Sequence, residues 1–209
     1  MSKSVETLVK DPALVAKRHT EICEAALKLF SKKGFHRTSV REIAKASGLP
    51  IGTLYSYIKT KEDIFYLIYN RILTSFQERM IQAINGIEDP EQQFVAALEE
   101  TLKIYDEYRD EVLLLYQESH VLGREALQSL MEVDRRYVAF FREILERGTK
   151  EGRFAVQDPH LIAVSILFLC AVWALKRWNL KGYGLEEVIG PLSRFILYGI
   201  KGPGRRSVA

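Results

Sequence analysis

Cysteine is scarce in this sequence, and the two that occur, Cys23 and Cys170, both lie in apolar stretches with helical periodicity. They form no Cys-x-x-Cys pair and have no histidine at metal-binding spacing, so we expect neither a disulfide framework nor a structural zinc site. Hydrolase, metalloprotease and phosphate-loop motifs are missing, and the four histidines are scattered along the chain. The sequence therefore predicts no enzyme, no metal site and no cofactor.

Long hydrophobic runs are also rare. The run LIAVSILFLCAVWAL, at residues 161–175, is apolar except for Ser165. It is shorter than the ~20 residues of a membrane-spanning helix, which favours a helix buried on nearly all sides and no membrane partner. The N-terminal residues MSKSVETLVK lack the apolar segment of a signal peptide, so we expect a cytoplasmic protein.

The charge of the chain is distributed unevenly. Residues 1–61 carry 12 Lys and Arg against 5 Asp and Glu, a net charge of +7. Residues 62–209 carry 18 against 22, a net charge of −4. The asymmetry favours a basic N-terminal module that meets a polyanion, although a solvated, lysine-rich N-terminus explains the same numbers.

Every strong periodicity in the sequence is helical, so the predicted fold class is all-α. Apolar residues recur every three or four positions over residues 17–33, which predicts a first amphipathic helix. Ser39 and Glu42 match a capping box, and Gly48 is a typical helix stop. These signals predict a second helix over residues 40–46.

Two further helices follow a tight turn. Pro50 suits the first turn of a short helix over residues 51–57. Thr60 and Asp63 then cap a long helix over residues 61–85. A helix, a glycine-containing turn and a short helix together predict a helix-turn-helix, which places its second helix in the major groove of double-stranded DNA.

The short helix carries groups that suit DNA. Leu54 and Ile58 are spaced to face inward, which leaves the polar side chains of the segment toward the outside. Hydroxyl and ammonium groups bind phosphates, and the segment offers Thr53, Tyr57, Lys59 and Lys61. The competing interpretation is that the tyrosines only pack the small helical bundle.

Residues 18–69 resemble the DNA-binding domain of the TetR family of bacterial transcriptional repressors. The matching motifs are A-x-x-L-F-x-x-x-G-F, T-S-V-x-x-I-A with its following A-x-G, and G-T-L-Y-x-Y-I-x-x-K-E. The resemblance implies phosphate contacts by Thr38, Ser39, Thr53, Tyr57 and Lys61. It places near the base edges Arg41, Ile51, Gly52 and Tyr55. The family usually has Ser, Lys or Gln where this chain has Ile51, so a side-chain hydrogen bond is lost there.

The rest of the chain predicts a larger helical domain. Helices are expected over residues 90–108, 112–122, 124–152, 159–178 and 184–200, the last kinked or interrupted near Gly190-Pro191. The predicted organisation is a flexible arm over 1–16, the helix-turn-helix domain over 17–62, a ligand-binding and dimerisation domain over 63–200, and a disordered tail over 201–209.

The last two helices carry more apolar surface than the core of one chain can hide. This surplus predicts a homodimer, and a two-fold dimer predicts a near-palindromic operator. The residues predicted at the subunit interface are Leu167, Cys170, Val172, Leu192, Ile196 and Ile200.

Aromatic side chains of the larger domain are candidates for an effector pocket, because TetR-family members bind a small molecule there. The candidates are Tyr105, Tyr108, Tyr116, Tyr137, Phe140, Phe141, Phe168 and Trp173, with Arg177 for an anionic head group. Such a pocket favours a hydrophobic effector. An aromatic stripe at helical spacing also fits an ordinary core, and Arg177 also fits a helix C-terminal cap.

The effector class stays open among alternatives. The stretch AVWALKRWNLKGYGLEEV resembles family members that control fatty-acid or sterol catabolism and respond to acyl-CoA thioesters. A multidrug-efflux repressor with an aromatic drug pocket is the second interpretation. A transcriptional activator or nucleoid-type DNA-binding protein is the third.

Overall fold

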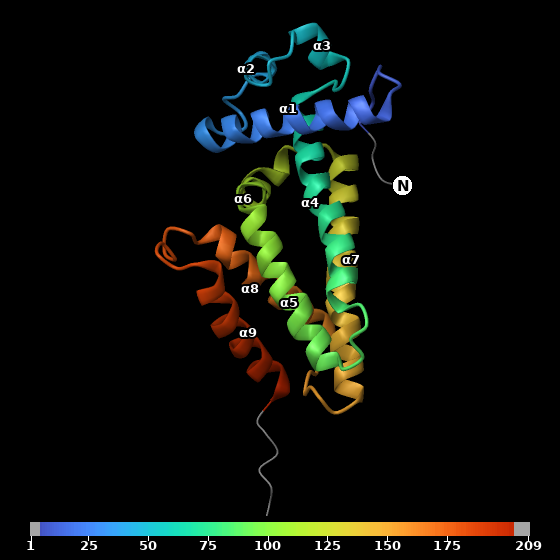
Figure 1. Cartoon of the computed structure of the whole chain (residues 1–209), viewed down its shortest axis with the longest axis vertical. Coiled ribbons are helices and arrows are strands. Elements are labelled where there is room, and N and C mark those ends of the chain that lie inside the picture. The colour runs from blue at the N-terminus through green and yellow to red at the C-terminus, as the bar shows by residue number, and fades with distance from the viewer. Residues whose placement is uncertain (1–4, 203–209) are drawn as a thin grey trace, which may run out of the picture. The chain divides into compact units, whose positions relative to one another are not determined.

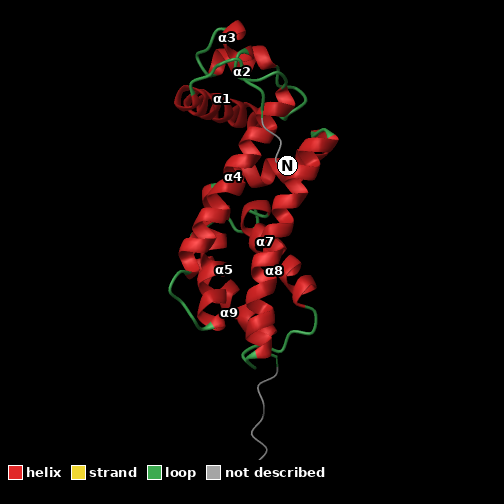
Figure 2. Cartoon of the chain, turned by 90° about the vertical axis from the view of Figure 1, so that its right-hand side faces the viewer, coloured by secondary structure: helices red, strands yellow, loops and turns green. Residues whose placement is uncertain are grey.

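The computed structural model describes residues 5–202, and within that range the chain forms helices and no strand, which confirms the all-α prediction (Figure 2). The helices belong to two compact units. Unit 1 comprises the residues up to Leu73 together with Asp110–Glu132. Unit 2 comprises Thr74–Arg109 together with the residues from Val133 onward.

Unit 1 combines the N-terminal helices with a segment from the middle of the chain (Figure 1). Its elements are α1 (Pro12–Lys33), α2 (Val40–Ala46), α3 (Ile51–Tyr55), the first part of α4 (Lys61–Ile84), α6 (Arg109–Glu118) from its second residue onward, the 3-10 turn η1 (Ser119–Val121) and the first part of α7 (Arg124–Lys150). Helix α2 packs against both α1 and α3. The predicted second helix is confirmed, because the capping box between Ser39 and Glu42 is formed.

Helix α1 begins earlier than the sequence analysis predicted. The carboxylate of Asp11 accepts hydrogen bonds from the backbone N–H groups of Ala13 and Leu14, and Pro12 occupies the first turn. An Asp-Pro pair of this kind satisfies the free donors of a helix start. Residues 12–16 are therefore helical, although they fall within the predicted arm.

Unit 2 is a helical bundle around one apolar core. Its elements are α5 (Pro90–Glu107), α8 (Pro159–Leu175), α9 (Leu185–Lys201) and the remaining parts of α4 and α7. Helix α5 packs against α8 and α9. Phe94, Phe141 and Cys170 are fully buried in this core. Among the described residues, no helix combines the length and apolarity needed to cross a membrane.

Helix α9 runs from Leu185 to Lys201 without interruption, although Pro191 lies inside it. Of the two predicted outcomes, a kink or an interruption, the interruption is wrong: the helix continues past Pro191, whose missing N–H removes one backbone hydrogen bond. Lys201 is helical, and residues 203–209 of the predicted disordered tail lie outside the described residues.

The predicted interface residues do not lie on a common surface. Leu167, Cys170, Ile196 and Ile200 are buried in the core of unit 2, so they are not available to a second copy of the chain. Val172 and Leu192 are half-buried. The exposed apolar residues of the same two helices are Leu161, Val164 and Phe168 on α8 and Phe195 and Tyr198 on α9.

Candidate DNA-binding surface and effector cavities

Backbone hydrogen bonds and apolar contacts fix the turn between α2 and α3. Gly48 has a φ of 70°, a conformation that glycine adopts without strain. The N–H of Leu49 donates to the carbonyl of Ala44 at 3.0 Å. Ile43 and Leu54 are fully buried, which orients α3 about its own axis. Residues 40–55 therefore form a helix-turn-helix.

The outer surface of α3 contains four of the predicted DNA-contacting residues. Ile51 is 39% exposed and Tyr55 is 48% exposed. Gly52 is also exposed, and a Cβ placed on it would meet no atom within 4 Å. Thr53 is half-buried at the edge of this surface. The phenol ring of Tyr55 is thus free of the core and available to a base or a phosphate.

The start of α2 is stabilised by its own side chains. The hydroxyl of Ser39 donates to the Glu42 carboxylate at 2.7 Å. The ion pair with Lys33, together with the hydrogen bonds from Ser39, lowers the pKa of Glu42 to about 2. Thr38 is buried and its hydroxyl donates to the carbonyl of Gly34 at 2.9 Å. The hydroxyls of Thr38 and Ser39 thus have intramolecular partners, whereas Arg41 is exposed.

Two predicted phosphate ligands are held inside unit 1. Tyr57 is only 4% exposed, and its carbonyl oxygen lies 2.9 Å from the ring nitrogen Nε2 of His19. The ammonium group of Lys61 donates to the carbonyls of Phe35 at 2.8 Å and Thr38 at 3.0 Å. It also lies 4.2 Å above the centre of the Phe35 ring. Lys61 thereby connects the start of α4 to the α1–α2 loop.

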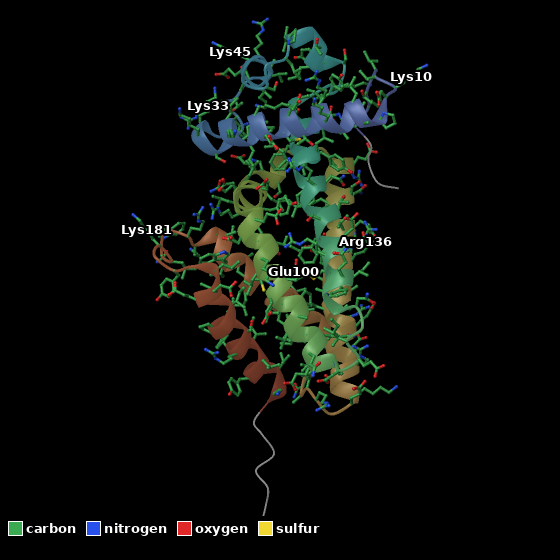
Figure 3. All side chains as sticks on the ribbon, in the orientation of Figure 1. Lys10, Lys33, Lys45, Glu100, Arg136 and Lys181 are labelled. Carbon is green, nitrogen blue, oxygen red and sulfur yellow. The ribbon has the colours of Figure 1, made fainter. Side chains whose placement is uncertain are left out.

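Other cations of unit 1 point outward. Lys10 and Lys45 are exposed and project from the unit (Figure 3), whereas the partly exposed Lys33 pairs with Glu42. Lys59 is exposed and forms an ion pair with Glu6. These side chains contribute to the net positive charge of residues 1–61.

Alanine at position 61 is expected to lower the free energy of unfolding of unit 1 by about 1–3 kcal/mol, because hydrogen bonds from a charged donor are lost. Lys59→Ala is the matched control. It is expected to change the free energy of unfolding by no more than about 0.5 kcal/mol. It is also expected to reduce the slope of log K for DNA binding against log salt concentration by about one. Urea unfolding and DNA titrations over a salt series measure both quantities. An unchanged stability and a flattened salt dependence for Lys61→Ala would return Lys61 to its sequence-predicted phosphate contact.

Unit 2 contains a cavity with a basic rim. It has a volume of about 580 Å³ and is lined by residues of α5 and α8, by the first residues of α6 and α9, and by the loop before α9. The indole N–H of Trp173 donates to the carboxylate of Asp106 at 2.9 Å, which fixes the ring in the wall. The cations that line the cavity are Arg109, Arg177 and Lys181, and Lys181 projects from the loop (Figure 3).

An apolar cavity of about 410 Å³ adjoins the basic one. The two share Trp173, Leu180 and Tyr183 as lining residues. The remaining walls are mostly aliphatic and aromatic: Leu169, Val172, Val188, Pro191, Leu192 and Phe195, with Glu187 as the one acidic residue. Together the two cavities offer an apolar compartment beside a cationic one.

The predicted aromatic pocket is not assembled as one set. Tyr137 and Phe140 line a separate cavity of about 280 Å³, and burial raises the pKa of Tyr137. Trp173 and Arg177 line the basic cavity. The others divide between core, unit 1 and surface: Phe141 is fully buried, Tyr105 and Tyr108 pack against the core, Tyr116 belongs to unit 1, and Phe168 is exposed.

Asp106, Arg109 and Lys181 were not among the site residues predicted from the sequence. Asp106 and Trp173 are 67 residues apart, and nothing in the local pattern of either segment indicates that they meet. Lys181 follows Arg177 by four residues, but it lies in a turn rather than on a helix, so helical periodicity gives no signal for it.

A basic N-terminal helix-turn-helix joined to a cavity-containing helical unit is typical of DNA-binding regulators that respond to a small molecule. Two family models support this class. The model described as "Bacterial regulatory proteins, tetR family" matches residues 22–66, and "Tetracyclin repressor-like, C-terminal domain" matches residues 88–182. The chain belongs to the TetR family of helix-turn-helix transcriptional regulators.

Relatives span most of the chain. The HTH-type transcriptional regulator HbdR of Aromatoleum sp. (strain CIB) is 27% identical over 177 residues, which cover 85% of this chain and 77% of HbdR. The structure of the regulator FadR from Bacillus subtilis with stearoyl-CoA has a TM-score of 0.73 at 23% identity and covers 87% of this chain and 99% of its own. The structure of AibR with isovaleryl coenzyme A and operator DNA has a TM-score of 0.74 at 24% identity. The match covers 89% of this chain and 99% of the AibR chain.

Proposed function

We propose that this chain is a dimeric repressor that binds a near-palindromic operator and releases it when an acyl-CoA binds. Residues 17–62 bind DNA in this proposal, and residues 63–200 bind the effector and form the dimer. The observation that carries the effector assignment is the apolar cavity that adjoins a cavity with three cations.

Operator binding rests on the exposed surface of α3 and on the basic charge of residues 1–61. Tyr55 and Ile51 face outward and lie near the base edges in this proposal. Arg41 and Lys59 are exposed as well, and in this proposal they contact phosphates or base edges. Thr38, Tyr57 and Lys61 support the helix-turn-helix from within.

The chemistry of an acyl-CoA matches the two cavities. Its acyl chain is apolar and its nucleotide head group carries phosphates, so one molecule needs an apolar compartment and a cationic one. Pockets for drug-sized ligands have volumes of about 300–1,000 Å³, a range that includes both cavities. Arginine binds phosphate through paired hydrogen bonds, a role that fits Arg109 and Arg177. The FadR and AibR structures, whose fold is similar, contain acyl-CoA ligands.

The exposed apolar face of α8 and α9 supports the dimer. Val164, Phe168 and Phe195 are each more than 40% exposed, and a second copy of the same face would cover them. In a two-fold dimer the two α3 helices are placed about one turn of DNA apart, or ~34 Å, which requires two half-sites.

Long-chain acyl-CoA is expected to weaken operator binding, and operator DNA is expected to weaken acyl-CoA binding by the same factor, because linkage is reciprocal. A ~100-fold factor corresponds to about 2.7 kcal/mol per site, which is enough to release an operator. Fluorescence anisotropy of a labelled operator and calorimetry of the acyl-CoA, each with and without the other ligand, measure both factors. Equal affinity of the acyl-CoA for free and operator-bound protein would remove it as the effector.

Two arginine variants locate the site. Arg177→Ala is expected to weaken acyl-CoA binding about tenfold or more, because a charged hydrogen bond to phosphate is lost. Arg136→Ala is the matched control, since Arg136 lines the separate cavity beside Tyr137. The reverse pattern would assign the effector to the Tyr137 cavity and would leave the repressor proposal intact.

A further inference from the structure

Three side chains of types that ligate metals meet on the surface of unit 1, one from the N-terminal part of the chain and two from a segment about 80 residues later. His36 lies in the loop between α1 and α2, Glu118 ends α6, and His120 lies in η1. The Glu118 carboxylate oxygen Oε2 is 3.7 Å from Nε2 of His36 and 3.9 Å from Nε2 of His120. One ligand atom from each residue lies within 4.8 Å of the other two. The two imidazole rings are 6.0 Å apart and inclined by 33°.

Two imidazoles and one carboxylate form a donor set that favours Zn²⁺ and similar divalent transition metals over Mg²⁺ or Ca²⁺, which prefer oxygen ligands. With metal–ligand distances of about 2.0–2.1 Å, ligand atoms of a tetrahedral site stand roughly 3.3 Å apart. The observed 3.7 and 3.9 Å are close to that spacing. Both histidine side chains are more than 60% exposed, so their rings have room to rotate toward a common ion.

The three residues are held by ordered structure. The carbonyls of Phe35 and Thr38 on either side of His36 accept hydrogen bonds from Lys61, which fixes the loop. The His36 ring also packs edge-to-face on the buried ring of Phe35, at 5.6 Å between centres. Glu118 is the least exposed of the three, with 19% of its side chain accessible. A site held on fixed backbone segments loses little conformational entropy when a ligand binds.

We propose that His36, Glu118 and His120 bind one divalent transition-metal ion, with Zn²⁺ as the best fit, and that a fourth position is open to water. The ion joins the α1–α2 loop to η1. Because His36 precedes the start of α2 by only a few residues, the ion also fixes the segment that holds Arg41 at the DNA-binding surface. This inference is independent of the proposed effector.

Cobalt is the probe for the site, because Co²⁺ in a tetrahedral nitrogen and oxygen environment absorbs visible light strongly. Untagged full-length protein, freed of metal with a chelator, is expected to bind one Co²⁺ per chain, and Zn²⁺ is expected to displace it. His36→Ala, His120→Ala and Glu118→Gln are each expected to lower the affinity at least about tenfold, since losing even a supporting residue costs 10–100-fold. His160→Ala is the control, because His160 is exposed on α8 outside the cluster.

Thermal unfolding gives a second readout that does not depend on colour. Zn²⁺ is expected to raise the Tm of wild-type protein and of His160→Ala, and to leave the Tm of His36→Ala and His120→Ala unchanged. The variants replace exposed side chains, so equal Tm values without metal check that they fold. The proposed metal site is refuted if the wild-type protein does not bind Co²⁺ at millimolar concentration. It is also refuted if His36→Ala and His120→Ala bind Co²⁺ with the wild-type affinity.

Discussion

Aspartate at Val164 and Phe195 together is expected to produce a folded monomer without specific operator affinity. Both residues are exposed in one chain, Val164 by 43% and Phe195 by 67%, so the substitutions leave the core of unit 2 intact. In a two-fold dimer they would bury four carboxylates in an apolar interface, at a cost of several kcal/mol per unpaired charge. A single helix-turn-helix then makes too few contacts to hold the operator.

Analytical ultracentrifugation at micromolar concentration and operator titration measure the two effects. Ile81→Asp is the control, because Ile81 is 60% exposed on α4 and lies outside the α8–α9 face. It is expected to remain dimeric and to bind DNA. A wild-type chain that sediments as a monomer, or a double variant that stays dimeric, would refute the interface. Substitutions at Ile196 give no such test, since Ile196 is buried in the core and a charge there would unfold the chain.

The second large effect concerns Gly148 and Phe154 in unit 2. A Cβ on Gly148 would lie 2.2 Å from the Cδ2 atom of Phe154. Phe154 is 5% exposed and packs edge-to-face on Phe94 at 5.7 Å, so its ring has no free space to enter. Gly148→Ala is therefore expected to lower the free energy of unfolding by ~1–3 kcal/mol, although glycine-to-alanine changes inside helices usually stabilise by up to ~1 kcal/mol.

A double-mutant cycle isolates this contact. Phe154→Ala alone is expected to cost ~3–5 kcal/mol, because it leaves a cavity in the core. Adding Gly148→Ala to it is expected to cost nothing further, because the clash is gone. Gly199→Ala in α9 is the control, since a Cβ there meets no atom within 4 Å. Additive losses in chemical denaturation would show that Gly148 is required for another reason.

Local signals were sufficient for most of the helices. The capping box at Ser39 and the reciprocal hydrogen bonds between Thr60 and Asp63 define the starts of α2 and α4 as the sequence analysis predicted. The start of α1 was missed because the Asp11-Pro12 signal precedes the apolar periodicity by several residues. Pro191 led to the opposite error, because it predicted an interruption that the structure does not have: α9 continues past it.

Positions that depend on tertiary contacts were harder to predict. Helix α8 is apolar on nearly every side, so its sequence gives no indication of which side faces the core and which faces outward. The prediction for Cys170 followed hydrophobicity alone, whereas the packing of α5 against α8 decides the orientation. Lys61 has the same limitation: its charge favours a phosphate, but three carbonyls of the α1–α2 loop lie within reach.

Each compact unit contains one buried thiol, Cys23 in unit 1 and Cys170 in unit 2. Burial raises the pKa of Cys23 to about 12 and raises that of Cys170 as well. A protonated, inaccessible thiol reacts with an alkylating reagent only while its surroundings are open. The alkylation rate of each cysteine therefore reports how often its own unit opens. Mass spectrometry of alkylated peptides measures the two rates separately, in the presence of DNA, effector or metal.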